Sequence, residues 1–300
     1  MTTQRDRVYE LVLGDTKTGD AIVINSSLQL TFEISKSSDN KRGSNSASIE
    51  VYNLSPSSIQ KLETEYLTCT FKVGYKETGP LVVVQGNVVE TKTVKRGVDY
   101  ITQIIMGEGY TELNHTKLKS LIGPGETIGG VIEEIRKQMP GVVRGSIVGA
   151  NLNNPVLFGY PLTGTPAEML RQVCEANRLE YNISGGVLNV SDENGLLSKN
   201  QVLAPVVSEQ SGLIDVPFYT SAEGRKLPKD KKRRRGVEFK SLLNAEYNPG
   251  FIVIIKSKVI SGTYRINSSR FTGDFRGGEW YVECFCSDVY AEDLKEDKKK

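Results

Sequence analysis

The most concentrated group of chemically active side chains is a basic tract, RKLPKDKKRRR, at residues 225–235. Its cations are Arg225, Lys226, Lys229, Lys231, Lys232, Arg233, Arg234 and Arg235. Such a tract could contact nucleic-acid phosphates or an acidic protein surface. A flexible solvated loop is the simpler interpretation, because blocks of like charge are often disordered. No aromatic residue lies among the cations, so we do not expect stacking on single-stranded bases.

No other residues form a pattern that predicts catalysis. His115 is the only histidine, and a histidine without a placed nucleophile and an orienting group makes no triad. Glu133 and Glu134 are adjacent on an expected helix, so they point in different directions. The sequence has no HExxH, GxSxG or GxxxxGK motif, and the glycines at 123–130 suit a turn before a helix. We expect a protein that is not an enzyme, with no catalytic residue and no cofactor.

The four cysteines are Cys69, Cys174, Cys284 and Cys286, and they form no CxxC pair. Cys284 and Cys286 lie two apart on one face of an expected strand, too far from each other for an unstrained disulfide. We expect buried, reduced thiols in place of a metal or redox site.

The composition is that of a soluble globular protein. The 300 residues are 38% hydrophobic and 25% charged, with a net charge of +2, which argues against a protein that grips nucleic acid over its whole surface. The N-terminus, MTTQRDRVYE, has no apolar segment of a secretory signal. The longest apolar runs, at 81–84 and 251–255, are too short to cross a bilayer. We expect synthesis in the cytoplasm and no membrane insertion.

Residues 1–110 have the pattern of short strands, with one short helix at 55–63. Leu28, Leu30, Phe32 and Ile34 alternate with polar residues, which is the period of a half-buried strand. Further strands are expected at 47–54, 67–75, 80–94 and 99–109. Ser55 and Pro56 suit the cap and the first position of the helix. This pattern predicts an N-terminal tube-like β-barrel.

Residues 111–200 predict a small α+β domain. A helix is expected within 125–139, with Ile128, Val131, Ile132, Ile135 and Met139 on one face. A second helix begins in 164–183, where Thr165, Pro166 and Glu168 have the spacing of a capping box. A hairpin turning at Ser184–Gly186 follows.

Strands resume from residue 237, after the basic loop, and predict a second tube-like β-barrel in 201–290. The charged tail, 291–300, is expected to be disordered. The segments match those of the first block in order: 47–55 with 235–243, TCTFKVG with GFIVIIK, 84–94 with 260–271, and VDYITQIIM with EWYVECFCS. In this alignment Glu50 meets Glu238 and Gly86 meets Gly262.

The matching order predicts one barrel present twice, on either side of a helical domain. Two unrelated β domains with similar alternation are the alternative. The fold class expected is mainly β with an α+β insertion. Three such chains could close as a ring that imitates six-fold symmetry. Trp280, the only tryptophan, is expected to anchor the second barrel, either in its core or against a neighbour, and the core is favoured.

Two long stretches resemble a known family. SIEVYNLSPSSIQKLE, VGY and VQGNVVETKT resemble the N-terminal domain of baseplate hub proteins of contractile-tailed bacteriophages. SLLN…PG, SGTYRI and GDFRGGEWY resemble their C-terminal domain. The resemblance covers nearly the whole chain, and relatives occur in R-type bacteriocins and in type VI secretion spikes.

The resemblance implies a virion protein of the tail baseplate. Such hubs are homotrimers whose pseudo-six-fold ring joins the hexameric tail tube, or its initiator, to the trimeric central spike. Baseplate wedge proteins would be further partners, and DNA would pass through the channel transiently. No spike or lysozyme-like segment follows residue 290, so we expect these functions on separate chains. A channel lined with cations would retain DNA, so the basic tract is expected on an outer or inter-subunit surface.

Three alternatives remain from the sequence. One is a nucleic-acid-binding β-barrel protein that uses the loop at 225–235. The second is a spike component of a type VI secretion system or a bacteriocin, which would share the fold. The third is a tail-associated hydrolase, for which no candidate residues are found.

Overall fold

The computed structural model describes residues 6–14, 21–38, 45–62, 67–221, 225–227 and 229–295. The strands within these ranges are β1 (Arg7–Leu13), β2 (Ile22–Asn25), β3 (Leu30–Ser37), β4 (Ser46–Tyr52), β5 (Thr68–Tyr75), β6 (Gly79–Arg96), β7 (Asp99–Gly107), β8 (Leu118–Ile122), β9 (Val143–Ile147), β10 (Tyr160–Gly164), β11 (Leu179–Ser184), β12 (Val187–Asp192), β13 (Val206–Ser208), β14 (Phe218–Thr220), β15 (Gly236–Leu242), β16 (Ile252–Lys256), β17 (Ser261–Asp274) and β18 (Trp280–Asp288). The helices are α1 (Pro56–Leu62), α2 (Tyr110–Asn114), α3 (Ile128–Lys137) and α4 (Pro166–Ala176). The predicted mainly β class is confirmed.

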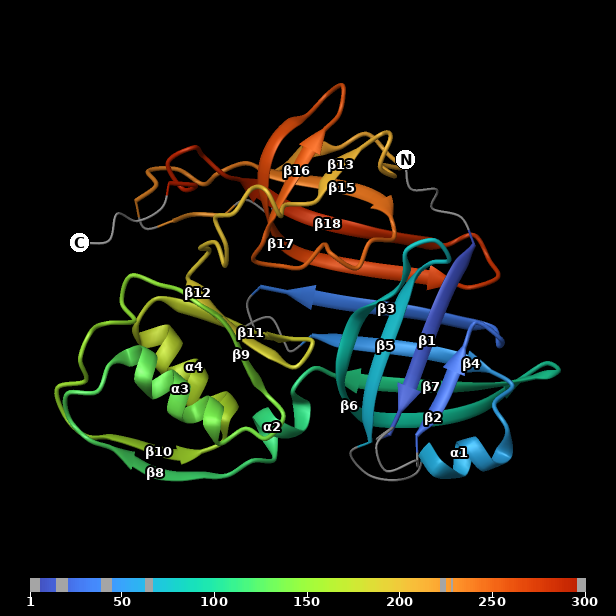
Figure 1. Cartoon of the computed structure of the whole chain (residues 1–300), viewed down its shortest axis with the longest axis horizontal. Coiled ribbons are helices and arrows are strands. Elements are labelled where there is room, and N and C mark those ends of the chain that lie inside the picture. Colours follow the sequence, from blue (N-terminus) through green and yellow to red (C-terminus); the bar gives the residue numbers. More distant parts are fainter. Residues whose placement is uncertain are drawn as a thin grey trace.

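The first seven strands form what we call the N-terminal β unit. They are neighbours in the order β3-β4-β7-β6-β5-β1-β2, and every pair is antiparallel. The sheet curls, so β1, β5 and β6 pack across β3, β4 and β7 (Figure 1). The rings of Phe32 and Phe71, from the two sides of this curl, lie 5.0 Å apart. The alternation predicted for β3 is confirmed, because Leu30, Phe32 and Ile34 are all buried.

Strands β13–β18 form the C-terminal β unit, which repeats this strand order. Its strands β15, β18, β17 and β16 are neighbours in the antiparallel order of β4, β7, β6 and β5. A β-bulge recurs at the same place, between Val88 and Glu90 in β6 and between Ile266 and Ser268 in β17. A bulge kept at the same point of the same ladder favours a duplicated unit over two unrelated β domains.

The expected alignment of Gly86 with Gly262 is shifted from the structural one. When the two bulges are superposed, Gly86 corresponds to Tyr264, two residues further along. In the same superposition Glu50 and Glu238, which the sequence alignment paired, also lie two positions apart. A shift of two residues leaves the alternation of buried and exposed side chains unchanged. The pattern of the sequence therefore could not detect it, whereas the ladder does.

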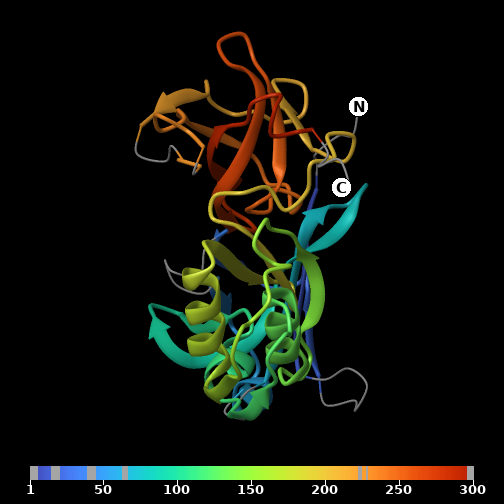
Figure 2. The ribbon, with the colours of Figure 1, turned by 90° about the vertical axis from the view of Figure 1, so that its left-hand side faces the viewer.

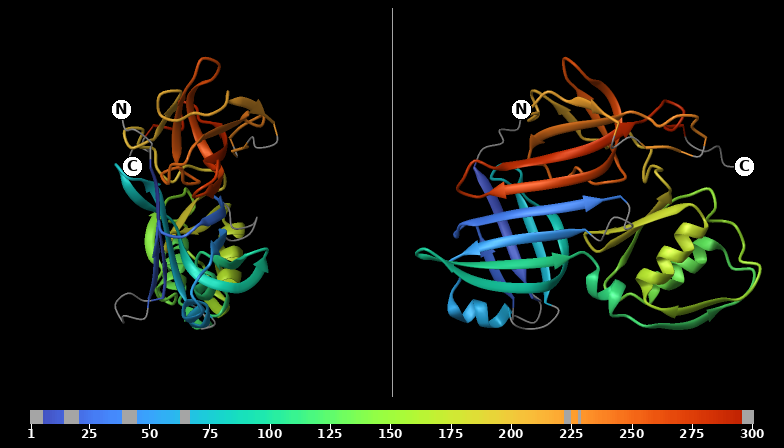
Figure 3. Two further views of the ribbon diagram at one scale, coloured as in Figure 1. Left: turned by 90° about the vertical axis from the view of Figure 1, so that its right-hand side faces the viewer. Right: turned by 180° about the vertical axis from the view of Figure 1, so that it is seen from behind.

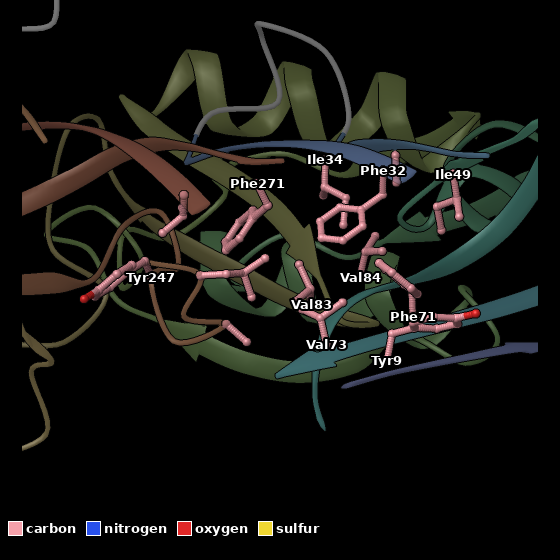
Figure 4. Close-up of a cluster of buried hydrophobic side chains, with 14 of the residues drawn as sticks. Tyr9, Phe32, Ile34, Ile49, Phe71, Val73, Val83, Val84, Tyr247 and Phe271 are labelled. Atoms are coloured by element: carbon pink, nitrogen blue, oxygen red, sulfur yellow. The ribbon is translucent and has the colours of Figure 1, made fainter. Parts of the chain in front are cut away.

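The two β units are parts of one 13-stranded sheet. β17 pairs with β3 in antiparallel register, with Phe271 opposite Ile34. Side chains from both units also share one hydrophobic core, in which Phe271 and Tyr247 gather with Phe32 and Phe71 (Figure 4). We call the β17–β3 contact the internal seam, and the sequence did not predict it.

The middle unit, from α2 to β12, has a core of its own. Strand pair β8–β10 and the sheet β11-β12-β9 enclose α3 and α4 (Figure 1). The predicted apolar face of α3 is confirmed, since Val131, Ile132 and Ile135 have no exposed surface. The capping box of α4 is confirmed as well: Thr165 and Glu168 each accept a hydrogen bond from the other's backbone N–H.

The C-terminal β unit lies above the N-terminal β unit and the middle unit, which lie side by side (Figures 1 and 3). Figure 2 shows the same stacking from the side of the middle unit, with α3 and α4 facing the viewer. All three units therefore meet near the centre of the molecule.

Candidate assembly surface

The basic tract does not form one charged surface, because two of its arginines point into the protein. Arg225 and Arg234 are each 3% exposed, and the backbone N–H of Arg234 donates to the Arg225 carbonyl oxygen at 2.8 Å. The other cations are exposed: Lys226, Lys229, Lys231, Lys232, Arg233 and Arg235. The tract is therefore a loop anchored at two points.

Two carboxylates neutralise the buried arginines. Asp230 accepts from Nε of Arg234 at 2.6 Å, and this interaction holds the pKa of Asp230 below its usual value. Asp293 accepts from Arg234 and, at 2.6 Å, from Nζ of Lys229. Although burial opposes it, these hydrogen bonds hold the pKa of Asp293 well below its usual range.

Asp293 belongs to the segment for which we expected disorder. The structure describes residues 291–295 of that segment, and they form a turn. The side chain of Asp293 is only 7% exposed. Tyr290, just before this turn, lies under the guanidinium of Arg234, 4.1 Å from its ring centre. The end of the chain thus fastens the basic loop.

Arg225 connects the loop to two other segments. Its Nη1 donates to the carbonyl oxygen of Asn194 at 2.8 Å, and its Nη2 donates to that of Asp288 at 3.1 Å. Burial lowers its pKa from the usual value. Of the exposed cations, Lys229 pairs with Asp293, and Arg235 covers the ring of Tyr219 at 4.3 Å.

Trp280 lies in the core, as favoured from the sequence. It is 2% exposed, and its ring meets that of Phe32 edge-on at 5.4 Å. The guanidinium of Arg7 lies 5.4 Å from the tryptophan ring. Because Phe32 belongs to β3, Trp280 packs across the internal seam.

A buried ion pair and a buried, hydrogen-bonded carboxylate, both missed by sequence reasoning, hold the three units together. Glu180 of β11 and Arg265 of β17 form a buried ion pair. Glu108 is 1% exposed and accepts from Nδ2 of Asn45 at 2.7 Å and from the backbone N–H of Gly185 at 2.8 Å. No local signal in the sequence marks such residues, because their partners are far away along the chain. The contacts fix the middle unit against both β units.

The sheet has free edges, which are the surfaces where another strand could add. Within the described part of the chain, β14 pairs only with β15 and β2 only with β1. β5 covers β6 only as far as Asn87, so residues 90–96 of β6 pair with β7 alone. Exposed apolar side chains lie at or near these edges. Phe218 of β14 is 53% exposed, and Val98, in the turn that joins β6 to β7, is 90% exposed.

The residues that the sequence offered as candidates for chemistry take part in capping, ion pairing or core packing. His115 is exposed and caps the C-terminus of α2. Glu133 pairs with Arg136 at 2.7 Å on one face of α3. All four cysteines are buried, and burial raises the pKa of the Cys69 thiol to about 12. The described residues contain no cluster of histidine, cysteine and carboxylate side chains that could hold a metal ion. They also include no helix long and apolar enough to cross a membrane.

Comparison by sequence finds no matching family model and no matching curated protein. Comparison by structure finds a tail protein from Neisseria meningitidis with a TM-score of 0.62 and 11% identity, covering 95% of this chain and 97% of that one. A tail protein of prophage MuSo2 from Shewanella oneidensis has a TM-score of 0.63 and 11% identity over 96% and 99% of the two chains.

A type VI secretion component from Escherichia coli, described as similar to the T4 bacteriophage tail proteins gp27 and gp5, has a TM-score of 0.58 and 11% identity. It covers 88% of this chain and 74% of that one. The chain therefore has the fold of phage tail proteins and of a type VI secretion component.

Proposed function

We propose that this chain is a structural baseplate hub of a contractile tail. Three copies would form a ring of six similar β units, with residues 1–110 and 201–290 as the tube-like units and 111–200 as a domain beside them. The observation that carries the proposal is the repeated strand order on one continuous sheet, β4-β7-β6-β5 and β15-β18-β17-β16. The fold shared with phage tail proteins supports the same assignment.

The proposed mechanism is mechanical and has no catalytic step. The ring would join the hexameric tail tube, or its initiator, to a trimeric central spike, and wedge proteins would surround it. DNA would leave through the channel once the spike has gone. Such a part must stay rigid while its partners move, and the buried contacts of Glu108 and of Glu180 with Arg265 supply that rigidity.

Light scattering on the purified chain, alone and mixed with its spike partner, tests the assembly. We expect a homotrimer, and a projection image along its axis should have six similar lobes. A chain that remains monomeric in both conditions would contradict the hub proposal.

The second candidate is a spike component of a type VI secretion system or a bacteriocin, which the structural likeness to such a component favours. Genes for a tail sheath and capsid beside this one would point to a phage, and genes for a secretion ATPase would point to the alternative. A muralytic assay tests the hydrolase alternative, and we expect no activity.

DNA binding through the basic loop is less favoured. Arg225 and Arg234 are engaged by carboxylates and carbonyl groups inside the protein, so fewer cations face a partner than the sequence suggests. A salt-sensitive affinity for DNA that vanishes when Lys231, Lys232 and Arg233 are replaced by alanine would favour it instead.

A further inference from the structure

The internal seam provides a template for a second contact. In it, residues 268–274 of β17 pair with residues 31–37 of β3. When the two β units are superposed on their bulges, 268–274 of β17 correspond to 90–96 of β6. This is the part of β6 that only β7 covers within the described residues.

The other side of the seam also has a counterpart. β14 pairs with β15 in the C-terminal β unit as β3 pairs with β4 in the N-terminal β unit. The registers of these ladders align β14 with the middle of β3, so Ile34 corresponds to Tyr219. The pair of β units inside one chain thus uses one copy of each edge. The other copies, residues 90–96 of β6 and strand β14, have no second strand partner among the described residues.

We infer that the free edge of β6 in one copy of this chain pairs antiparallel with β14 of a second copy. The inference rests on the proposed function and specifies its contact. Carrying the seam's register over places Thr93 opposite Tyr219 and Val94 opposite Phe218. The occupant of each edge is a second copy, because the same fold already makes this contact within one chain.

The backbone of β6 has the required direction. The carbonyl oxygen of Tyr100 in β7 accepts from Asn53 at 2.7 Å and so faces β4. Backbone groups in a ladder face alternate sides. The preceding residue, Asp99, therefore turns its backbone groups toward β6, where it pairs with Arg96. Arg96 and Val94 therefore face β7, and Thr93 turns its N–H and carbonyl oxygen to the free edge.

β14 meets the same condition. The Arg235 carbonyl oxygen accepts from Asp288 and so faces β18, which leaves Gly236 facing β14, where it pairs with Thr220. Tyr219 therefore turns its backbone to the free edge and can exchange both hydrogen bonds with Thr93. Pro217 also faces this edge, and a proline without an N–H is tolerated there because its carbonyl can still accept.

The contact is head-to-tail, since it joins two different edges, and such contacts close into a ring when the rotation from one copy to the next closes. The side chains suit it: Val94 would meet Phe218, which is 53% exposed in the single chain.

Disulfide trapping tests the register. Val94 and Phe218 would form a pair without mutual hydrogen bonds, whose Cα atoms lie about 4.5 Å apart, within the range of a disulfide. Under oxidation, the double variant Val94→Cys/Phe218→Cys should convert most of the protein to covalent dimers and closed trimers. The matched control, Lys92→Cys/Val216→Cys, joins β6 to a residue two positions before β14. It lies four residues out of the inferred register and should remain mostly uncrosslinked.

A third variant, Thr93→Pro in the Val94→Cys/Phe218→Cys background, removes the outward N–H and leaves the residues facing β7 unchanged. It should abolish crosslinking while circular dichroism reports a folded chain. Light scattering on the wild type separates the possible failures. If trimers form but the control pair crosslinks equally or the test pair does not, the inferred register is wrong and the hub proposal stands. If the wild type is monomeric throughout, both fail.

Discussion

Arg265 of β17 and Glu180 of β11 form a buried ion pair between the C-terminal β unit and the middle unit. Their side chains are 1% and 4% exposed. Nε of Arg265 also donates to the carbonyl oxygen of Gly195 at 2.6 Å, and its Nη1 donates to Asn267 at 2.8 Å. The guanidinium is therefore supported on several sides, which is the condition under which a buried charge is tolerated.

Removal of one partner of this pair should destabilise the protein strongly. We expect Glu180→Gln to lower the free energy of unfolding by about 3–5 kcal/mol, because Arg265 keeps its charge in a buried site. Urea denaturation followed by circular dichroism measures the loss. Glu180→Leu combined with Arg265→Met should recover much of it, since no unpaired charge remains. If the double variant were as unstable as Glu180→Gln, the loss of stability could not be explained by an unpaired buried charge.

The Asp293 carboxylate should make stability depend on pH. Its pKa is lowered in the folded state from the usual 3.8, so its contribution is complete above that value and is lost as the pH falls below it. We expect Asp293→Asn to cost about 1–3 kcal/mol at neutral pH. Thermal denaturation at pH 7 and pH 3 tests this, since the gap between the variant and the wild type should narrow at pH 3. If the stability difference between the variant and the wild type were the same at both pH values, Asp293 would not be the cause of the pH dependence.

The close packing at the internal seam leaves no room for a methyl group at Gly273. A Cβ there would collide with the ring of Phe32 and approach that of Trp280. We expect Gly273→Ala to destabilise the protein by about 1–3 kcal/mol through overpacking. Gly278→Ala is the matched control, because nothing lies within 4 Å of a Cβ at that position. Equal melting temperatures for the two variants would contradict the packing argument.

The capping box of α4 should contribute measurably to stability. The side chain of Thr165 accepts from the backbone N–H of Glu168 at 3.3 Å. Thr165→Ala leaves that donor without its partner and should cost about 1 kcal/mol. Thr163→Ala, on the exposed face of β10, is the control and should change the unfolding free energy by less than about 0.5 kcal/mol. Chemical denaturation of both variants at one pH makes the comparison.

The sequence predicted the local structure well where the signal was local. The spacing of Val131, Ile132 and Ile135 identified the buried face of α3, and the pattern at Thr165 identified the start of α4. The repeated order of segments predicted two β units with like topology. These features depend on residues close in the chain, whose periodicity reflects which face is buried.

The residues at the meeting point of the three units had no such signal. In the sequence Glu108, just after β7, and Arg265, in β17, look like ordinary surface charges, and their partners lie far away along the chain. The basic tract showed the opposite error. It read as one exposed block, yet Arg225 and Arg234 are buried because Asp230, Asp293 and carbonyl groups surround them.

The sequence by itself predicted the class of fold and the helices α1, α3 and α4, and it favoured a duplicated β unit, because alternation, helical periodicity and turn residues are local features of the chain. Only the tertiary structure decided the register of the duplication, the β17–β3 seam and the edges that stay free. A shift of two residues preserves alternation, and a strand's partner is set by packing and hydrogen bonds across the whole sheet.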